Sequence, residues 1–483
     1  MPVKQPIVVM WFRQDLRIAD NPAFMHACKT SNRVLPIYIL DDENSGRWKM
    51  GAASRWWLHE SLRKLNESLE GNLCLALGDA RSILSELTRR FSVEGVFWNR
   101  CYEPWRIKRD SEIEESLREA GIAARSWNGS LLIEPRDLVK ENGEPYRVFT
   151  PFFKNCWRLR SSTFREPLGV PPTRNLFGCR MRELCELRLM PQIPWYREMR
   201  EEWRPGETGA QIRLRKFLDN GLKGYRIGRD YPARAIVSRL SPHLHFGEIS
   251  ANQIWSGIAG SLQCDDTRSD AEYFLRELAW REFSYSLLFF NHDLPSKNLN
   301  SKFDEFPWRE DAGYLKAWQL GRTGYPIVDA GMRELRITGY MHNRVRMIAG
   351  SFLVKNLLLR WKSGANWFWD SLVDADLANN SANWQWVAGS GTDAVPYFRI
   401  FNPVSQGNKF DPEGAYVRKF CPELSKLPNK YLHSPWQAST EILEAAGLQL
   451  GRTYPFPIVD LASSRMRALE AFALTKGKPV KRI

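Results

Sequence analysis

One segment with a helical sequence pattern contains a carboxylate, an indole and a guanidinium that are spaced to lie on the same side of a helix. Within residues 271–290, Glu277, Trp280 and Arg281 stand at positions i, i+3 and i+4, which project from one face of an α-helix. Such a wall can hydrogen-bond to a polar ligand and stack on it. The alternative is an exposed helix face with an intrahelical Glu–Arg pair, and spacing alone does not separate the two.

The segment 340–358 repeats this geometry. Asn343, Arg346 and Met347 stand at i, i+3 and i+4, and the helix continues as an apolar stretch typical of a buried helix. A buried arginine needs an anion, which Asp374 or Asp376 could supply. The remaining carboxylate would then be available to a cofactor's hydrogen-bond donor, but spacing does not choose between them. This concentration of polar residues predicts a large polar cofactor inside a helical domain.

Two tryptophans of the segment SANWQWVAG should have different roles. Trp384 and Trp386 are two residues apart, so in a helix they point about 200° apart and face opposite sides. The chain has 20 tryptophans, enough to supply stacking surfaces. For most of them, however, core packing is the default interpretation.

An upstream stretch could bind an anion. Tyr225 is followed by Ser238, Arg239 and Ser241 just before an expected helix. Hydroxyl groups, free backbone N–H groups and an arginine at a helix start favour a phosphate site. An ordinary serine N-cap explains the same stretch equally well.

Several other chemistries lack their motifs. No H-E-x-x-H or C-x-x-C occurs, so we expect no metal site. The first strand is not followed by G-x-G-x-x-G, and neither a Walker A motif nor a G-x-S-x-G nucleophile elbow is present. The eight scattered cysteines indicate a reducing cytoplasm. No apolar run reaches the length of a membrane span, which predicts a soluble protein.

The charge balance favours a polyanionic partner. The sequence of 483 residues has 69 Lys and Arg against 55 Asp and Glu, a formal net charge of +14. A basic protein gains affinity for nucleic acid through counterion release. Because basic proteins without such a partner are also common, charge alone does not decide the matter.

The chain is expected to contain an α/β half and an α half. Residues 1–135 alternate β-branched runs with amphipathic helical stretches, as in a parallel sheet of Rossmann-like type. Residues 136–206 are rich in Pro and Arg and are interpreted as an interdomain linker. Residues 207–470 are predicted to form an all-helical domain, because helical periodicity with scarcely any alternating strand signal runs from about residue 210 to about Leu424. Residues 471–483 are expected to form a short basic tail.

At these motifs the sequence resembles the photolyase and cryptochrome flavoprotein family, closest in style to the bacterial class I and class III enzymes. The resemblance runs nearly end to end and rests on VVMWFRQDLRIADNPA, GYPIVDAGMREL, MHNRVRM, the DADLANN to NWQW stretch, and GTDAVPYFRIFNP. It implies an α/β antenna domain, a long linker and a helical domain that holds FAD, active as FADH⁻.

The resemblance also implies roles for residues around FAD. Arg346 would lie over the isoalloxazine ring and pair with Asp374, which leaves Asp376 for the flavin pyrimidine edge. Asn380 would face flavin N5, and Phe274 stands near the flavin where a Trp is frequent. The phosphates and ribitol would be held by Tyr225, Ser238, Arg239, Leu240, Ser241 and Arg281.

By the same resemblance, a flipped cyclobutane pyrimidine dimer would lie against a pocket of indole, carboxyl and amide groups. Its residues are Glu277, Trp280, Asn343, Met347 and Trp386. An electron-relay chain would consist of Trp384, Trp361 and Trp318. DNA would contact Trp280, Arg346, Trp386, Arg399 and Lys409, although Arg399 and Lys409 could be ordinary surface charges.

The family resemblance predicts a light-dependent carbon–carbon lyase acting on UV-damaged DNA. The His342–Asn343 pair resembles that of enzymes for cyclobutane dimers. Methenyltetrahydrofolate is favoured over deazaflavin as antenna chromophore, with Glu103 as a contact. We expect a cytoplasmic bacterial monomer associated with the nucleoid through DNA. The alternative is a cryptochrome-type blue-light photoreceptor with little or no repair activity.

Overall fold

The computed structural model describes residues 5–392 and 398–475 and divides the chain into two compact units. The first unit comprises Met1–Gly224, Ser238–His292 and Val373–Asp376. The second comprises Tyr225–Val237, Asp293–Leu372 and Leu377–Ile483. Part of the matched motif GTDAVPYFRIFNP, residues 393–397, lies outside the described residues, as does residue 476 onward of the predicted basic tail.

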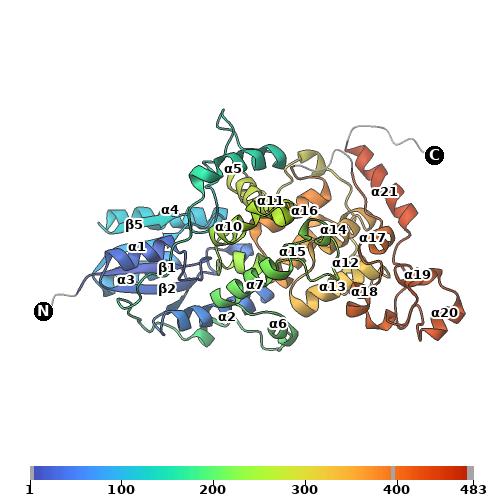
Figure 1. Ribbon diagram of the computed structural model, residues 1–483, viewed down its shortest axis with the longest axis horizontal. Helices are drawn as coiled ribbons and strands as arrows, with labels where there is room; N and C mark the ends of the chain where they lie inside the picture. Colours follow the sequence, from blue (N-terminus) through green and yellow to red (C-terminus); the bar gives the residue numbers. More distant parts are fainter. Residues whose placement is uncertain (1–4, 393–397, 476–483) are drawn as a thin grey trace. The chain divides into compact units, whose positions relative to one another are not determined.

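A parallel sheet of five strands forms the base of the first unit, in the order β3-β2-β1-β4-β5 (Figure 1). The strands are β1 (Ile7–Phe12), β2 (Val34–Leu40), β3 (Cys74–Leu77), β4 (Val93–Asn99) and β5 (Ala123–Trp127). Both β1 and β2 are buried along their whole length because helices cover both faces of the sheet. The predicted α/β fold class is confirmed.

The sheet is covered by α1 (Pro22–Thr30), α2 (Ala52–Ser68), α3 (Ala80–Arg90) and α4 (Pro104–Glu119). On one face, Leu84 of α3 and Ile113 of α4 join a core with Val9 and Trp11 of β1. On the other face, Phe24 of α1 packs against β1. The sequence pattern did not reveal α1, which is short, or β5, which lacks a β-branched run.

The predicted linker 136–206 belongs to the first unit and contains helices of its own, α5 (Phe149–Thr163) and α6 (Arg197–Glu202). Its backbone is attached to the sheet, since Phe177 N donates to Val34 O over 3.1 Å. Further on, the buried Glu248 accepts a hydrogen bond from Gly206 N. The segment is therefore tied to the sheet and to the helices that follow it.

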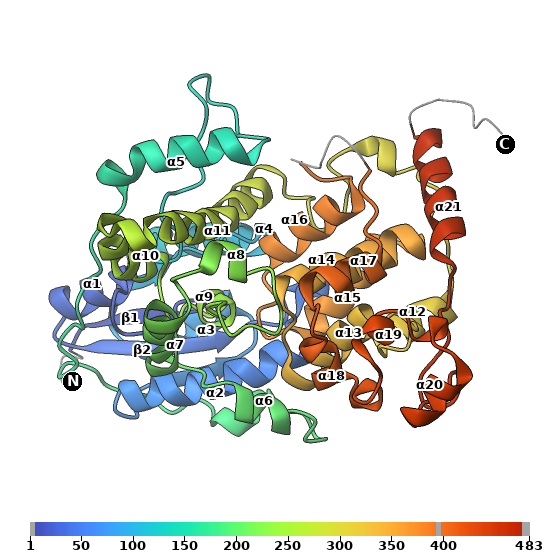
Figure 2. The ribbon, with the colours of Figure 1, turned by 45° about the vertical axis from the view of Figure 1, so that its right-hand side comes forward.

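The remaining helices of the first unit are α7 (Glu207–Asn220), α9 (Ser241–His245), α10 (Ala251–Ala259) and α11 (Asp265–Phe290). Figure 2 shows α5 alongside the long helix α11, a contact that joins the linker to the candidate site. The first turn of α11 contains Asp265 and Asp266. Their negative charges stabilise the helix because they lie at the positive end of its dipole.

The second unit is helical over its described residues, as its sequence periodicity predicts. Its longer helices are α12 (Ala312–Gln319), α13 (Pro326–Thr338), α14 (Asn343–Ser351), α15 (Trp361–Ser371), α16 (Leu377–Ala388), α17 (Pro403–Phe410) and α21 (Leu461–Leu474). The shorter ones are α8 (Tyr225–Gly228), α18 (Ala415–Phe420), α19 (Asn429–Leu432) and α20 (Thr440–Ala445). Since α21 ends at Leu474, the first four residues of the predicted tail are helical. Within the described chain, no helix is long and apolar enough to cross a membrane.

Candidate functional site

Helix α11 presents the predicted Glu277, Trp280 and Arg281 on one face. The indole of Trp280 stacks on the ring of Phe149 from α5, with centroids 3.6 Å apart and planes 8° from parallel. All three side chains of the wall are half-buried. The linker helix thus orients the tryptophan by covering one face of its ring.

Arg281 is held by several partners in the first unit. Its Nη1 donates to Ser130 O and to Glu282 Oε1, both over 3.0 Å, and its guanidinium lies 4.8 Å from the ring centroid of Tyr285. Burial alone would lower the pKa of Arg281, but the surrounding Tyr285, Glu282 and Asp376 raise it. The arginine therefore remains a cation although only 11% of its side chain is exposed.

The two carboxylates that spacing could not distinguish have different hydroxyl partners. Ser241 Oγ donates to Asp374 Oδ2 over 2.6 Å, and Tyr285 Oη donates to Asp376 Oδ2 over 2.6 Å. Both aspartates are at most 9% exposed. His245 Nδ1 lies 3.7 Å from Asp376 Oδ2 and has no hydrogen-bond partner among the described residues. A buried polar atom of this kind suits a polar ligand nearby.

The backbone of the predicted anion site is strained at one residue. Arg239 has φ of 54°, in the left-handed region that non-glycine residues rarely adopt, and Leu240 follows in the right-handed region. Successive N–H groups in such a turn can form a concave anion site. The Arg239 side chain pairs with Glu202 and lies 5.1 Å from the ring centroid of Trp203.

In the second unit, the turn before α14 is built by buried hydrogen bonds. Glu334 Oε2 accepts from His342 N over 3.1 Å and from Tyr416 Oη over 2.6 Å. His342 is the N-cap of α14, and its side chain accepts from Arg344 N. Asn343 is exposed at the first position of this helix. The turn and its cap thus determine where α14 begins.

Arg346 and Met347 are half-buried and, at i+3 and i+4 from Asn343, continue its face of α14. The Nε of Arg346 donates to Met341 O over 2.7 Å, and the guanidinium lies 5.0 Å from the ring centroid of Tyr340. The backbone turn before α14 therefore orients this arginine.

Helix α16 carries Asn380, Trp384 and Trp386. Asn380 Nδ2 donates to Ala365 O of α15 over 3.0 Å. Trp384 is 4% exposed, whereas Trp386 is half-buried and lines a cavity. The two tryptophans thus have different environments, as expected from a spacing of two residues in a helix.

Buried aromatic rings surround Trp384. Its ring centroid lies 6.2 Å from that of Trp318 and 5.0 Å from that of Phe368. Gly364 allows this packing, since a Cβ there would lie 2.1 Å from the indole. Trp318 is fully buried and donates to Ala349 O, while Trp361 is 2% exposed and donates to Asn298 Oδ1. The three predicted relay residues therefore belong to the interior of the second unit.

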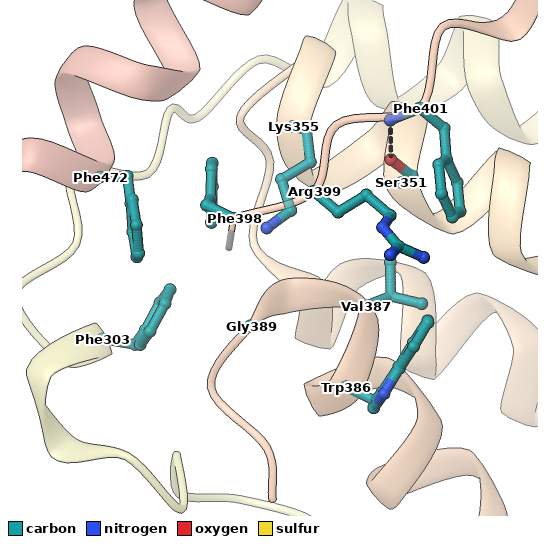
Figure 3. A pocket seen from close by; sticks show the side chains of 10 residues that line it. All are labelled: Phe303, Ser351, Lys355, Trp386, Val387, Gly389, Phe398, Arg399, Phe401 and Phe472. Carbon is teal, nitrogen blue, oxygen red and sulfur yellow. Dashed lines mark hydrogen bonds between the residues drawn. The ribbon is translucent and has the colours of Figure 1, made fainter. Parts of the chain in front are cut away.

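Trp386 and Arg399 line a cavity together with four phenylalanines (Figure 3). Its volume is about 50 Å³. Lys355, 2% exposed, donates to Ala388 O over 2.9 Å and lies 3.1 Å from the ring centroid of Phe398. Burial holds its pKa well below the usual value. Lys409, the other predicted DNA contact, is exposed on α17.

Tyr225 and Phe274 are buried. The ring of Tyr225 lies 5.6 Å from the Arg229 guanidinium, and Phe274 packs against Phe217 with centroids 4.5 Å apart. The packing around Phe274 is that of an ordinary hydrophobic core. Its role near the flavin rests only on its position in the motifs of the resembled family.

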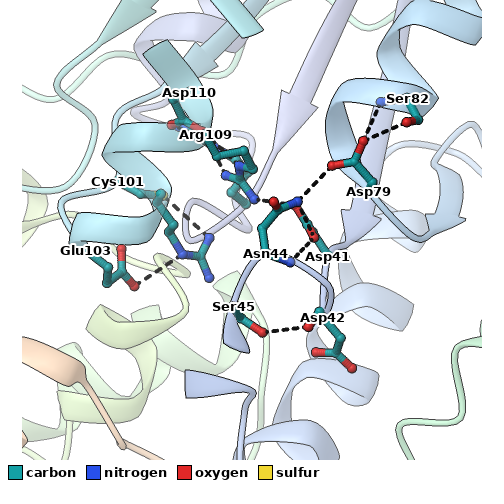
Figure 4. Close-up of polar contacts among 12 residues, drawn as sticks. Asp41, Asp42, Asn44, Ser45, Asp79, Ser82, Cys101, Glu103, Arg109 and Asp110 are labelled. Atoms are coloured by element: carbon teal, nitrogen blue, oxygen red, sulfur yellow. Dashed lines mark hydrogen bonds and ion pairs between the residues drawn. The ribbon is translucent and has the colours of Figure 1, made fainter. Parts of the chain in front are cut away.

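At the carboxyl edge of the sheet, ion pairs and hydrogen bonds surround Glu103 (Figure 4). Gln14 Nε2 donates to Glu103 Oε1 over 2.9 Å, and Arg106 Nε lies 3.3 Å from the same oxygen. Glu103 Oε2 is buried and has no hydrogen-bond partner among the described residues. Nearby, Arg109 pairs with Asp41 over 3.1 Å. This edge therefore offers one buried acceptor to a ligand.

Comparison with known proteins shows the family of the chain. The family model of DNA photolyase matches residues 8–172, and that of the FAD binding domain of DNA photolyase matches residues 274–474. A deoxyribodipyrimidine photo-lyase of Agrobacterium fabrum is 47% identical over 484 residues, covering 99% of each chain. The chain belongs to the photolyase and cryptochrome family.

Two further members of the family illustrate its range. The crystal structure of a bacterial class III photolyase from Agrobacterium tumefaciens matches with a TM-score of 0.93 and 47% identity, over 99% of each chain. Cryptochrome-2 of Arabidopsis thaliana is 38% identical over 97% of this chain and 79% of its own. The photolyase likeness is the stronger of the two.

Each unit contains buried polar residues that sequence reasoning did not identify and that contact the predicted site residues or the helices carrying them. Tyr285 binds Asp376, and Glu334 builds the turn before Asn343. Lys355 donates to the last carbonyl of α16. Glu334 lies in the motif GYPIVDAGMREL, but no spacing rule singled it out, and Tyr285 and Lys355 contact residues 91 and 33 positions away. A buried charged or phenolic residue in an otherwise apolar helix was the available signal.

Proposed function

We propose that this protein is a DNA photolyase that uses light to split cyclobutane pyrimidine dimers, with reduced FAD as cofactor. The observation that carries the proposal is the placing of a carboxylate, an indole and a guanidinium on α11, in a chain 47% identical to a photolyase from end to end. The choice of cyclobutane dimers rests on the His342–Asn343 pair that caps and begins α14.

The residues present fit FAD. Buried carboxylates with hydroxyl partners suit the N–H groups of a flavin edge, and the strained turn at Arg239 suits a phosphate. Reduced FAD, when bound, supplies a photoexcitable electron donor. We propose that it is held by Tyr225, Ser238, Arg239, Leu240, Ser241, Phe274, Arg281, Arg346, Asp374, Asp376 and Asn380.

The lesion would be bound by stacking and hydrogen bonding. Extruding a base costs a few kcal/mol, and stacking on an indole recovers about 1–3 kcal/mol per base. Trp280 and Trp386 supply indoles, while Glu277 and Asn343 supply groups that bond pyrimidine edges and Met347 packs beside them. Glu277 would also stabilise, by hydrogen bonding, the negative charge that develops on the dimer. Arg346, Arg399 and Lys409 would contact DNA phosphates.

The tryptophan cluster fits an electron relay. Trp384 and Trp318 lie in edge-to-face contact, and Trp361 begins the helix that packs on Trp384. We therefore assign to Trp384, Trp361 and Trp318 the reduction of oxidised flavin. Trp318 is fully buried, so it has no direct contact with a reductant in solvent.

Methenyltetrahydrofolate, favoured over deazaflavin, fits as an antenna chromophore, because the buried Glu103 Oε2 offers an acceptor to a pterin N–H. We further propose a cytoplasmic monomer that binds UV-damaged DNA in the nucleoid; the formal net charge of +14 supports the nucleic-acid partner. Released chromophores identified by absorption and mass spectrometry would test the antenna assignment. A deazaflavin spectrum would contradict it.

The decisive experiment measures thymine-dimer reversal by purified, reduced protein under blue light. Wild type should restore monomers, and Glu277→Gln should bind FAD normally but repair more slowly. Cryptochrome relatives at 38% identity make a photoreceptor the second candidate. A protein that binds FAD and photoreduces it, yet leaves dimers intact, would refute the repair proposal and favour the photoreceptor.

A further inference from the structure

Tyr285 of the first unit contacts Asp376, one of the two carboxylates that we assign to cofactor binding. Its ring is 5% exposed, and its hydroxyl donates to Asp376 Oδ2 over 2.6 Å. It projects from α11 four residues after Arg281, whose guanidinium covers the phenol ring at 4.8 Å. The hydroxyl thus contacts Asp376 directly, while the charge of Asp376 helps to raise the pKa of Arg281 on the same helix.

A phenol that donates to a buried carboxylate does two things. It restricts rotation of the carboxyl group, since Oδ2 must stay on the hydroxyl, and it draws negative charge away from the other oxygen. Burial and the Asp376 charge raise the pKa of Tyr285 well above its usual value, so the phenol keeps its proton. The hydroxyl is thus a permanent donor to Asp376.

We propose that Tyr285 is a positioning residue that orients Asp376 toward the flavin pyrimidine edge and makes the bound flavin easier to reduce. The inference rests on the proposed binding of FAD by Asp376. Reduction adds negative charge to the flavin, which a concentrated carboxylate charge nearby opposes. By dispersing that charge, the Tyr285 hydroxyl favours the reduced cofactor.

The chain offers a matched control for this hydroxyl. Tyr102 is 2% exposed, packs edge-to-face on Tyr285 with centroids 5.9 Å apart, and donates its hydroxyl to Glu134 Oε1 over 2.8 Å. Tyr102→Phe and Tyr285→Phe therefore each remove one buried hydroxyl bonded to a carboxylate. Only Tyr285→Phe removes it from Asp376.

The test is spectroelectrochemical titration of FAD in the purified holoproteins. Tyr285→Phe should lower the equilibrium constant for flavin reduction on the order of tenfold, whereas Tyr102→Phe should leave it unchanged. In an Asp376→Asn background, Tyr285→Phe should have no further effect. Equal potentials for wild type and Tyr285→Phe would overturn the inference. Failure of wild type to bind FAD would instead overturn the proposed function.

An independent observation concerns two thiols of the first unit. Cys74 of β3 and Cys179 of the linker lie 105 residues apart, yet their Sγ atoms are separated by 3.1 Å. Backbone pairing of the linker with β2, through Phe177 N to Val34 O, holds Cys179 beside the sheet. The hydrogen bond with Cys74 and then the charge of Arg90 lower the pKa of the half-buried Cys179, while the same hydrogen bond and burial raise that of Cys74.

We infer that Cys74 and Cys179 are a site of reversible oxidative modification. The Cys179 thiolate attacks hydrogen peroxide and forms a sulfenic acid, with release of hydroxide. The Cys74 thiol then attacks that sulfur and water leaves, which yields a disulfide. In total, two thiols are oxidised while one peroxide is reduced to two waters. The bond would fasten the linker to the edge strand.

Peptide mapping without reductant tests this inference. Peroxide treatment of the full chain should produce a cross-linked pair of peptides containing residues 74 and 179, which dithiothreitol reverses. Cys74→Ser should leave Cys179 trapped as a sulfenic or more oxidised acid, and Cys264→Ser, at an exposed lone thiol, should leave the cross-link intact. Oxidation of Cys179 in wild type with Cys74 still a free thiol would overturn the inference.

Discussion

Replacing Glu282 with glutamine should change how the stability of the protein depends on pH. Glu282 follows Arg281 on α11, is 3% exposed, and accepts hydrogen bonds from Leu132 N and Arg281 Nη1 over 2.9 Å and 3.0 Å. Burial raises its pKa to about 7 despite these donors. The folded protein therefore holds a proton on this carboxyl at pH values where the unfolded chain has lost it.

The sign follows from linkage. Because the folded-state pKa lies above the unfolded value of 4.5, the proton stabilises the folded state below about pH 7. Stability from this group is lost as pH rises from 4.5 to about 7. One pKa unit corresponds to 1.36 kcal/mol, so the loss amounts to about 3 kcal/mol at most.

The assay is urea unfolding of wild type and Glu282→Gln between pH 5 and pH 8. Glutamine resembles the protonated acid and does not titrate, so the variant should gain stability relative to wild type as pH rises, by up to about 3 kcal/mol. Glu67→Gln, at an exposed carboxylate of α2, is the control and should show no such gain. If the difference in free energy of unfolding between wild type and Glu282→Gln stays constant from pH 5 to pH 8, the reasoning is refuted.

Three further outcomes follow from the proposed site. Trp386→Ala should weaken binding of dimer-containing DNA roughly ten- to a hundredfold in fluorescence anisotropy while FAD content is unchanged, because one stacking surface worth about 1–3 kcal/mol is lost; unaltered affinity would count against its stacking role. Trp384→Phe should slow photoreduction of oxidised FAD, followed by absorption, yet repair normally after chemical reduction. Equal photoreduction would remove Trp384 from the relay. Arg399→Ala should reduce the slope of log affinity against log salt by about 1 and weaken binding to damaged and undamaged DNA alike, whereas an unchanged slope would make Arg399 a surface charge without a phosphate contact.

Local periodicity was sufficient to predict much of the architecture. Buried β-branched runs such as Ile7–Phe12 and Val34–Leu40 predicted a parallel sheet, because only strands covered on both faces are apolar throughout. Spacing at i, i+3 and i+4 was sufficient to place Glu277, Trp280 and Arg281 on one helix face. Helix α1 and the edge strand β5 were not predicted, because α1 is short, β5 is polar, and neither has a strong periodic pattern.

The sequence by itself determined the fold class, the residue types of the candidate site and the faces of the helices that carry them, since these depend on neighbours within about one helical turn. Only the tertiary structure decided which partners those residues have. Ser241 meets Asp374 across 133 residues, Tyr285 meets Asp376 across 91, and Cys74 meets Cys179 across 105. Such contacts depend on how helices and strands that are distant in sequence pack together. The spacing of residues along the chain does not tell which of these elements become neighbours in space.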